Sequence, residues 1–434
     1  MDFSRGELLA LAALGLFALL FFKPVVAGDG FGYYAILEGG VRDGTLNLSQ
    51  QLRFNAVANG TEVMLWPATG TYFSQYAPGL ALVSAPLYAV SLVLDDFRVF
   101  HVADAFFLQE RGDILVHMAA VAVTSLAFAA AAVLLSLFLL RKIGLQKQAA
   151  AAVLLAFFGS PLIRYATYDL TYSHAVEAGL LAAAVYLFIV DDRKSFWAGA
   201  LLGVMTLVRY SSVVFALPFA AYYLCRGKGG DAGKLVLGML PFIAALALYW
   251  IALFGFPLIS SYEASHIVQG TGSFLGLPSV SSLVAVLFSL SRDPPGLLWW
   301  TPLCIAALYG VWLWRNEKKW VLLSLFALLL LVTASSFNGT TGFSFSHRYF
   351  AALFIIYALG CGVLLKEFGR KARLALGAMA CWTVLLFVLH LAGGFSGFPT
   401  LNSLWEFWVA QGNFGRLPQL VFEKLGLVRL LLQR

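Results

Sequence analysis

The apolar runs of this chain constrain its fold more than any other feature. Of the 434 residues, 61% are hydrophobic and 12% are charged, whereas an ordinary soluble domain is about one quarter charged. Many runs approach the roughly 17–25 residues that a helix needs to cross a bilayer. The sequence therefore predicts an all-α polytopic membrane protein with about 11 transmembrane helices.

One moderately apolar run, at 79–94, decides how the loops are divided between the two sides of the membrane. If it lies along the membrane surface, the short basic loops fall on the side of the N-terminus, as expected for cytoplasmic loops. The later loops depend on the two short runs 195–209 and 211–225. One long helix there would move every later loop to the other side of the membrane. The predicted spans are 7–26, 114–140, 149–163, 174–190, 195–209, 211–225, 234–254, 297–314, 320–336, 349–365 and 374–392.

This layout leaves the polar and aromatic segments on the outer side, where the first outer loop covers about 27–113 and includes the surface-lying run. We predict one transmembrane domain over 1–392, in the plasma or inner membrane, followed by an amphipathic tail at 393–434. The four cysteines lack metal-ligand spacing. The sequence also lacks nucleotide-phosphate, zinc and dinucleotide motifs. We therefore predict no cofactor and no nucleic-acid partner.

The stretch Gly28-Asp29-Gly30-Phe31-Gly32-Tyr33-Tyr34 opens the first outer loop. A charged group at the membrane boundary usually faces a cavity or a partner and marks function. Three glycines in five residues allow positive φ angles and a close approach of the backbone to a ligand. The alternative interpretation is an interfacial turn with a belt of tyrosines.

Four arginines fall at predicted outer helix ends or loops. A single arginine there is more often an anchor whose guanidinium reaches the interface. Four together, on the same side as Asp29, favour a shared ligand, and guanidinium groups match phosphate oxygens in a bidentate manner. The predicted ligand is the phosphate of a lipid carrier, and the arginines are Arg164, Arg209, Arg292 and Arg348.

Histidines and tyrosines complete the predicted site. His174 and His347 lie at outer span ends and could bind phosphate or carry a proton, although a structural hydrogen bond is the commoner role. Tyr33, Tyr34 and Tyr165 could stack on a sugar, and an interfacial belt explains them equally well.

In this order, the motifs resemble those of the GT-C superfamily of polytopic glycosyltransferases, which use polyprenyl-phosphate sugars. That superfamily includes the protein O-mannosyltransferases and the lipid A aminoarabinose transferase. The resemblance covers most of 1–365 and includes the early acid after the first span and the long outer loop with a surface helix. The similar stretches are Gly28-Asp29-Gly30 with Tyr33-Tyr34, Phe158-Gly159-Ser160-Pro161 with Tyr165, and the segments 203–209, 289–297 and 343–349.

The resemblance implies a fold of GT-C type and a catalytic base at Asp29. Some relatives carry two adjacent acids there, but Gly30 follows Asp29 in this chain. We therefore predict no metal site, although a divalent cation is not excluded. The implied reaction is an inverting transfer of a sugar from a polyprenyl phosphate to a hydroxyl of a lipid, glycan or protein acceptor, on the outer face of the membrane.

Two other functions stay open. A lipid-linked glycan ligase or polymerase would use the same type of carrier with a diphosphate leaving group. A transporter or flippase for a lipid-linked sugar would favour inverted repeats and interrupted helices near the membrane midplane. The charged residues lie instead at one end of the predicted spans.

Overall fold

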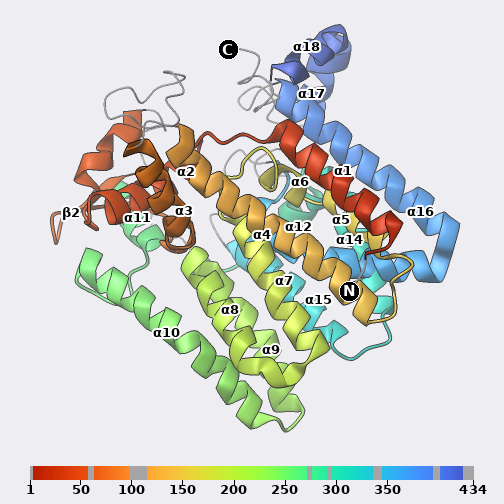
Figure 1. Cartoon of the computed structure of the whole chain (residues 1–434), viewed down its shortest axis with the longest axis horizontal. Coiled ribbons are helices and arrows are strands. Elements are labelled where there is room, and N and C mark those ends of the chain that lie inside the picture. Colours follow the sequence, from red (N-terminus) through yellow and green to blue (C-terminus); the bar gives the residue numbers. More distant parts are fainter. Residues whose placement is uncertain are drawn as a thin grey trace.

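A computed structural model describes residues 3–56, 63–96, 115–270, 276–290, 296–335, 345–393 and 401–423, and these residues are mostly helical. Figure 1 shows a bundle in which α10 lies on the opposite side from α1 and α16. The apolar helices are α1 (Arg5–Phe21), α4 (Leu115–Lys142), α5 (Ala149–Phe158), α7 (His174–Val190), α8 (Ser195–Val208), α9 (Ala216–Cys225), α10 (Gly229–Phe254), α14 (Pro302–Leu313), α15 (Lys319–Ser335) and α16 (Phe354–Gly393).

Three segments of the described chain are long and apolar enough to cross a membrane by themselves. They are Val116–Lys142, Gly229–Phe254 and Arg348–Gly393, and most of the other apolar helices have 10–17 residues. The predicted spans 349–365 and 374–392 fall within η6 (Arg348–Leu353) and α16, and the chain turns between the two spans at Gly369, where φ is +53°. These helices agree with a multi-pass membrane protein.

Two predicted spans are interrupted. The span 149–163 ends as a helix at Phe158, and the short helix α6 (Leu162–Tyr165) follows Gly159-Ser160-Pro161. The span 297–314 consists of α13 (Leu297–Trp300) and α14, which begins at Pro302. Proline lacks the N–H that an interior helical position donates, so the helices break at these sites.

The runs 195–209 and 211–225 are two separate passes of the chain. Arg209 has extended backbone and separates α8 from η4 (Tyr210–Phe215) and α9. Gly199 of α8 lies against Leu235 of α10, and Gly203 lies against Met239, so these two helices run parallel. The chain must therefore return between them, as the sequence pattern predicted.

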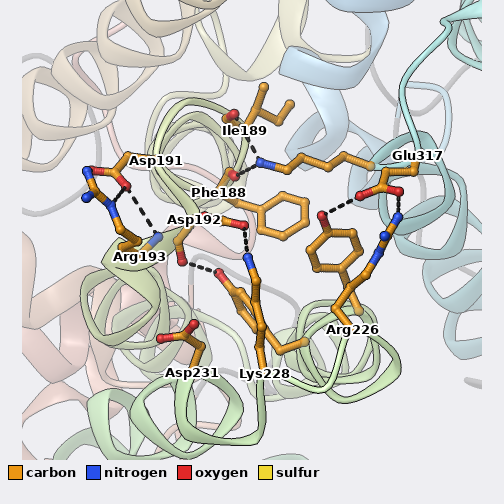
Figure 2. Close-up of polar contacts among 12 residues, drawn as sticks. Phe188, Ile189, Asp191, Asp192, Arg193, Arg226, Lys228, Asp231 and Glu317 are labelled. Atoms are coloured by element: carbon orange, nitrogen blue, oxygen red, sulfur yellow. Dashed lines mark hydrogen bonds and ion pairs between the residues drawn. The ribbon is translucent and has the colours of Figure 1, made fainter.

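Three predicted basic loops meet at one end of the bundle, as Figure 2 shows. Lys228 pairs with Asp192 at 2.7 Å, and Arg226 pairs with Glu317. Lys318 donates to the Phe188 carbonyl at 2.8 Å, at the C-terminal end of α7. Since His174 begins α7, the histidine end and the basic end of the bundle are separated by the length of that helix.

The first long loop contains α2 (Gly30–Leu37), η1 (Glu38–Arg42), η2 (Leu48–Ala56) and α3 (Gly79–Asp96). It also contains an antiparallel hairpin, β1 (Met64–Trp66) with β2 (Thr71–Phe73), so the all-α prediction is wrong for this segment. The Trp66 and Phe73 rings pack on Phe254 at 5.4 and 5.0 Å. Burial of these aromatic rings against α10 stabilises a hairpin that would be marginal alone.

Helix α3 lies at the end of the bundle opposite the basic loops. Its first residue, Gly79, contacts Leu207 and Val208 at the end of α8. Its Tyr88 ring lies 5.6 Å from His117, in the first turn of α4. This position fits a helix that lies along the surface, since its start and its middle both contact helix ends.

The remaining elements border the same end. In the sequence, two short helices, α11 and α12, come between α10 and α13, and η6 directly precedes α16. The tail after α16 packs against that helix through α18 (Figure 1). The elements are α11 (Ser261–Gln269), α12 (Val280–Phe288), η6 (Arg348–Leu353), α17 (Leu401–Trp405), η7 (Glu406–Ala410), η8 (Asn413–Arg416) and α18 (Leu417–Phe422).

Candidate functional site

Asp29 and Arg348 form an ion pair that joins the segment after α1 to the segment before α16. Asp29 directly precedes α2, and Arg348 begins η6. The Arg348 Nη1 donates to Asp29 Oδ2 at 2.6 Å, and the side chains are 14% and 23% exposed. A partly exposed carboxylate held by one guanidinium edge is both oriented and accessible.

The glycines around Asp29 admit other side chains of the same chain. A Cβ atom at Gly28 would lie 2.1 Å from the Tyr172 hydroxyl, and Gly28 also has φ of +52°. A Cβ atom at Gly30 would lie 2.3 Å from the Thr171 hydroxyl. The predicted reason for these glycines, approach to a ligand, is thus replaced by close packing of the 166–173 loop.

Several aromatic side chains lie beside the Asp29–Arg348 ion pair. The Arg348 guanidinium lies 5.8 Å from the Tyr172 ring and 5.6 Å from the Tyr349 ring. Tyr165 packs on Tyr172 at 5.9 Å and on His174 at 4.7 Å. These contacts bring the predicted residues Tyr165, His174 and Arg348 together with two tyrosines that the prediction of the site did not include.

Arg209 is held by a buried cluster at the start of α7. Its Nη1 lies 3.2 Å from Glu177 Oε2 and 3.2 Å from His174 Nδ1. Ser212 donates to Glu177 Oε1 at 2.7 Å. The guanidinium also stacks over the Tyr349 ring at 3.6 Å, so Arg209 is fixed on two sides.

Of the two adjacent tyrosines on α2, Tyr33 belongs to the site. Its hydroxyl donates to Ser173 at 3.1 Å, and its ring packs on Tyr76 at 4.7 Å. Burial raises the pKa of the Tyr33 hydroxyl, and Asp29 and Arg209 both act on it electrostatically. Tyr34 instead packs on Tyr88 of α3 at 5.9 Å and is fully buried.

Arg164 is enclosed in the structure. Its guanidinium contacts Asp169 at 2.5 Å and His390 at 2.7 Å, and only 1% of the residue is exposed. It therefore braces the 162–173 segment against the end of α16, and its charge is already compensated by a buried carboxylate.

The two remaining predicted residues are His347 and Arg292. His347 is fully buried, its ring lies 5.9 Å from Phe350, and burial lowers its pKa to about 3. Within the described part of the chain, neither of its ring nitrogens has a hydrogen-bond partner. Its imidazole is neutral, which disfavours direct phosphate binding through charge. Arg292 lies outside the described residues.

The described residues contain no group of three or more His, Cys, Asp or Glu side chains that could hold a metal ion. Asp29 pairs with the cation Arg348. Among the described residues, the ion-pair partner of Asp29 is thus a guanidinium.

An apolar groove of about 530 Å³ lies beside the charged cluster. Ile36 and Leu37 of α2 line it, together with Leu207, two residues before Arg209. Leu82 of α3 and Leu248 of α10 also line it and are 56% and 66% exposed, so the groove opens to the outside of the bundle. Helix α2 thus contributes Tyr33 to the site and its following turn to the groove.

Solved structures share this fold at low sequence identity. No family model and no curated protein match the sequence. The archaeal oligosaccharyltransferase AglB from Archaeoglobus fulgidus, solved with an inhibitory peptide and a dolichol-phosphate, matches with a TM-score of 0.51 and 11% identity over 97% of this chain. The oligosaccharyltransferase of the same organism in its apo form matches with a TM-score of 0.51 and 12% identity over 97% of this chain. This chain spans 56% of either one, and the likeness shows that the chain shares the fold of that part.

Proposed function

We propose that this protein is an inverting glycosyltransferase of the plasma or inner membrane, which takes a sugar from a polyprenyl phosphate at the outer face. The observation that carries the proposal is the Asp29–Arg348 pair, a partly exposed carboxylate beside a guanidinium at the exit of α1. The likeness to a solved oligosaccharyltransferase fold supports the enzyme class. Dolichol-phosphate, the lipid bound in one of those structures, has the chemistry that arginine forks recognise.

In this mechanism Arg348 holds Asp29 Oδ2, and Oδ1 takes the proton of the acceptor hydroxyl. The hydroxyl oxygen forms a bond to the anomeric carbon, and the bond from that carbon to the phosphate oxygen breaks with its electron pair on the phosphate. The transition state resembles an oxocarbenium ion. Arg209 and the remaining donors of Arg348 stabilise the growing phosphate charge. A phosphate leaving group needs no general acid, so one carboxylate suffices.

The apolar groove supplies a place for the isoprenoid chain of the donor. It opens to the outside of the bundle through Leu82 and Leu248, and Leu207 is among its lining residues. A chain in the groove would place its phosphate near Arg209, which follows Leu207 in the sequence. The hydrophobic contact would then hold the donor, and the charged groups would act mainly at the reacting bond.

A second candidate is a lipid-linked glycan ligase that uses a diphosphate carrier, and the likeness to oligosaccharyltransferases favours transfer of a glycan. Purified enzyme should be given polyprenyl-monophosphate sugars and polyprenyl-diphosphate glycans, each with and without a chelator. The proposal expects transfer from the monophosphate donor at equal rates in both conditions. Transfer only from the diphosphate would establish the ligase, and loss of activity with chelator would contradict the metal-free mechanism.

A further inference from the structure

The carboxylate of Glu177 is buried in the first turn of α7 and is held by three side chains. Ser212 donates to Oε1 at 2.7 Å, while Arg209 and His174 lie 3.2 and 3.3 Å from Oε2. Removing a carboxylate from water is costly unless it is paired and hydrogen-bonded. Three partners on one buried acid meet that requirement, so the cluster is a fixed unit.

Arg209 connects this cluster to the proposed reaction site. Its guanidinium lies 3.6 Å from the centre of the Tyr349 ring, and Tyr349 neighbours Arg348 in sequence. Arg348 in turn pairs with Asp29. Tyr33 donates to Ser173, which caps α7 one turn before Glu177. Glu177 is therefore separated from the Asp29 site by Arg209 and the surrounding tyrosines.

Charge matching is the common feature of the arginines that the structure describes here. Arg348 pairs with Asp29, Arg164 with Asp169, and Arg209 with Glu177. An acid that fully compensates a phosphate-binding arginine weakens its attraction for phosphate. A buried Glu177 thus weakens the binding of phosphate by Arg209, but it fixes the position of the Arg209 guanidinium.

We propose that Glu177 is the positioning residue of the donor-phosphate site, holding Arg209 where the leaving phosphate develops its charge. The inference rests on the proposed function and extends it to a residue outside the predicted site. Glu177 does not touch the donor. It acts through Arg209, so its removal affects donor binding and turnover in opposite directions.

Glu177→Gln keeps the shape of the side chain and leaves the Arg209 charge uncompensated. Binding of a sugar-free polyprenyl phosphate should tighten by about tenfold. This is the effect expected when one negative charge near the phosphate is removed from a partly buried site. The value of kcat should fall by about 10- to 100-fold, because a small misplacement of a charged group is costly in the transition state. Glu177→Asp should restore the wild-type affinity for polyprenyl phosphate but only part of kcat.

The test compares the full-length wild type with Glu177→Gln, Glu177→Asp and Glu7→Gln. Glu7 is a matched control, since it is also a buried carboxylate near an arginine, Arg141 at 3.8 Å, but lies at the N-terminal end of α1. Glu7→Gln should leave both affinity and kcat unchanged. If Glu177→Gln does not fold, Ser212→Ala replaces it, with lower kcat and unchanged affinity expected.

Weaker binding of polyprenyl phosphate by Glu177→Gln, or wild-type affinity and kcat for its folded fraction, would overturn the inference and leave a purely structural ion pair. Wild-type affinity and kcat in Ser212→Ala would overturn it equally. If the wild-type protein itself binds no polyprenyl phosphate, the proposed function fails, and the two failures are thereby distinguished.

Discussion

Asp29 and Arg348 are 319 positions apart in the chain, yet their side chains meet at 2.6 Å. One residue ends the turn after α1 and the other begins η6, which leads into α16. The contact therefore ties the segment after α1 to the segment before α16 at the proposed site of chemistry.

Replacement of Arg348 should reduce activity more than stability. Arg348→Ala removes the partner that orients the Asp29 carboxylate and one of the phosphate donors. Loss of such a charge-assisted contact costs about 2–5 kcal/mol, so kcat/KM should fall by more than tenfold. Arg348→Lys should recover only part of the loss, because an ammonium lacks the planar fork. Equal activity of the Lys and wild-type enzymes would show that the fork has no role.

Gly32 is a test of the packing around α2. An added Cβ would lie 2.2 Å from the Tyr76 ring and 2.7 Å from the Ser74 hydroxyl. Gly32→Ala should therefore destabilise the protein by about 1–3 kcal/mol, the usual effect of overpacking. Gly15→Ala in α1 is the control, since nothing lies within 4 Å of its added Cβ. Thermal unfolding in detergent measures both, and equal melting temperatures would contradict the packing described here.

The groove can be tested by filling it. Ala85 of α3 lines the groove, so Ala85→Trp should raise KM for long-chain polyprenyl donors and leave KM for a short-chain analogue unchanged. Leu87→Trp is the control on the same helix, because Leu87 is 41% exposed and is not among the groove-lining residues. An equal KM for both chain lengths in Ala85→Trp would remove the groove from the proposed donor site.

The sidedness of the loops follows from the position of the basic residues. In a background that lacks the native cysteines, single cysteines at Gly44 and Thr69 should react with an impermeant thiol reagent from outside. Cysteines at Lys147 and Lys228 should not, since these lie in the basic loops expected in the cytoplasm. Labelling of the Lys228 position from outside would mean that the proposed orientation is inverted.

The sequence pattern predicted much of the helical layout because apolar length is a property of each segment by itself. Passes such as 195–209 and 211–225 are therefore visible without knowledge of their neighbours. The hairpin at 64–73 was missed, since its stability comes from the contact of Trp66 and Phe73 with Phe254, far along the chain. Such contacts have no local signal.

The sequence selected candidate residues for the site, but it could not predict how they pair. Asp29 and Arg348 stand in recognisable motifs, whereas the partners of Arg164 and Arg209 depend on how α6, α7 and η4 pack. Glu177 was missed, although an acid inside an apolar run is itself a signal of a functional or buried partner. The enclosure of Arg164 could be known only from the packing around it.

The central claim is that Asp29 is the base, and a nearly isosteric substitution tests it most directly. Asp29→Asn should keep the fold, because the change is nearly isosteric, and should not weaken the binding of polyprenyl phosphate, because it removes a negative charge beside Arg348. Turnover of a polyprenyl-phosphate sugar should fall by about 10²–10⁴-fold, the contribution of a positioned base. The decisive measurement is the single-turnover rate of sugar transfer by the purified wild type and Asp29→Asn at equal donor occupancy. A rate for Asp29→Asn within a factor of about two of the wild type would contradict the account and place the base on another acid.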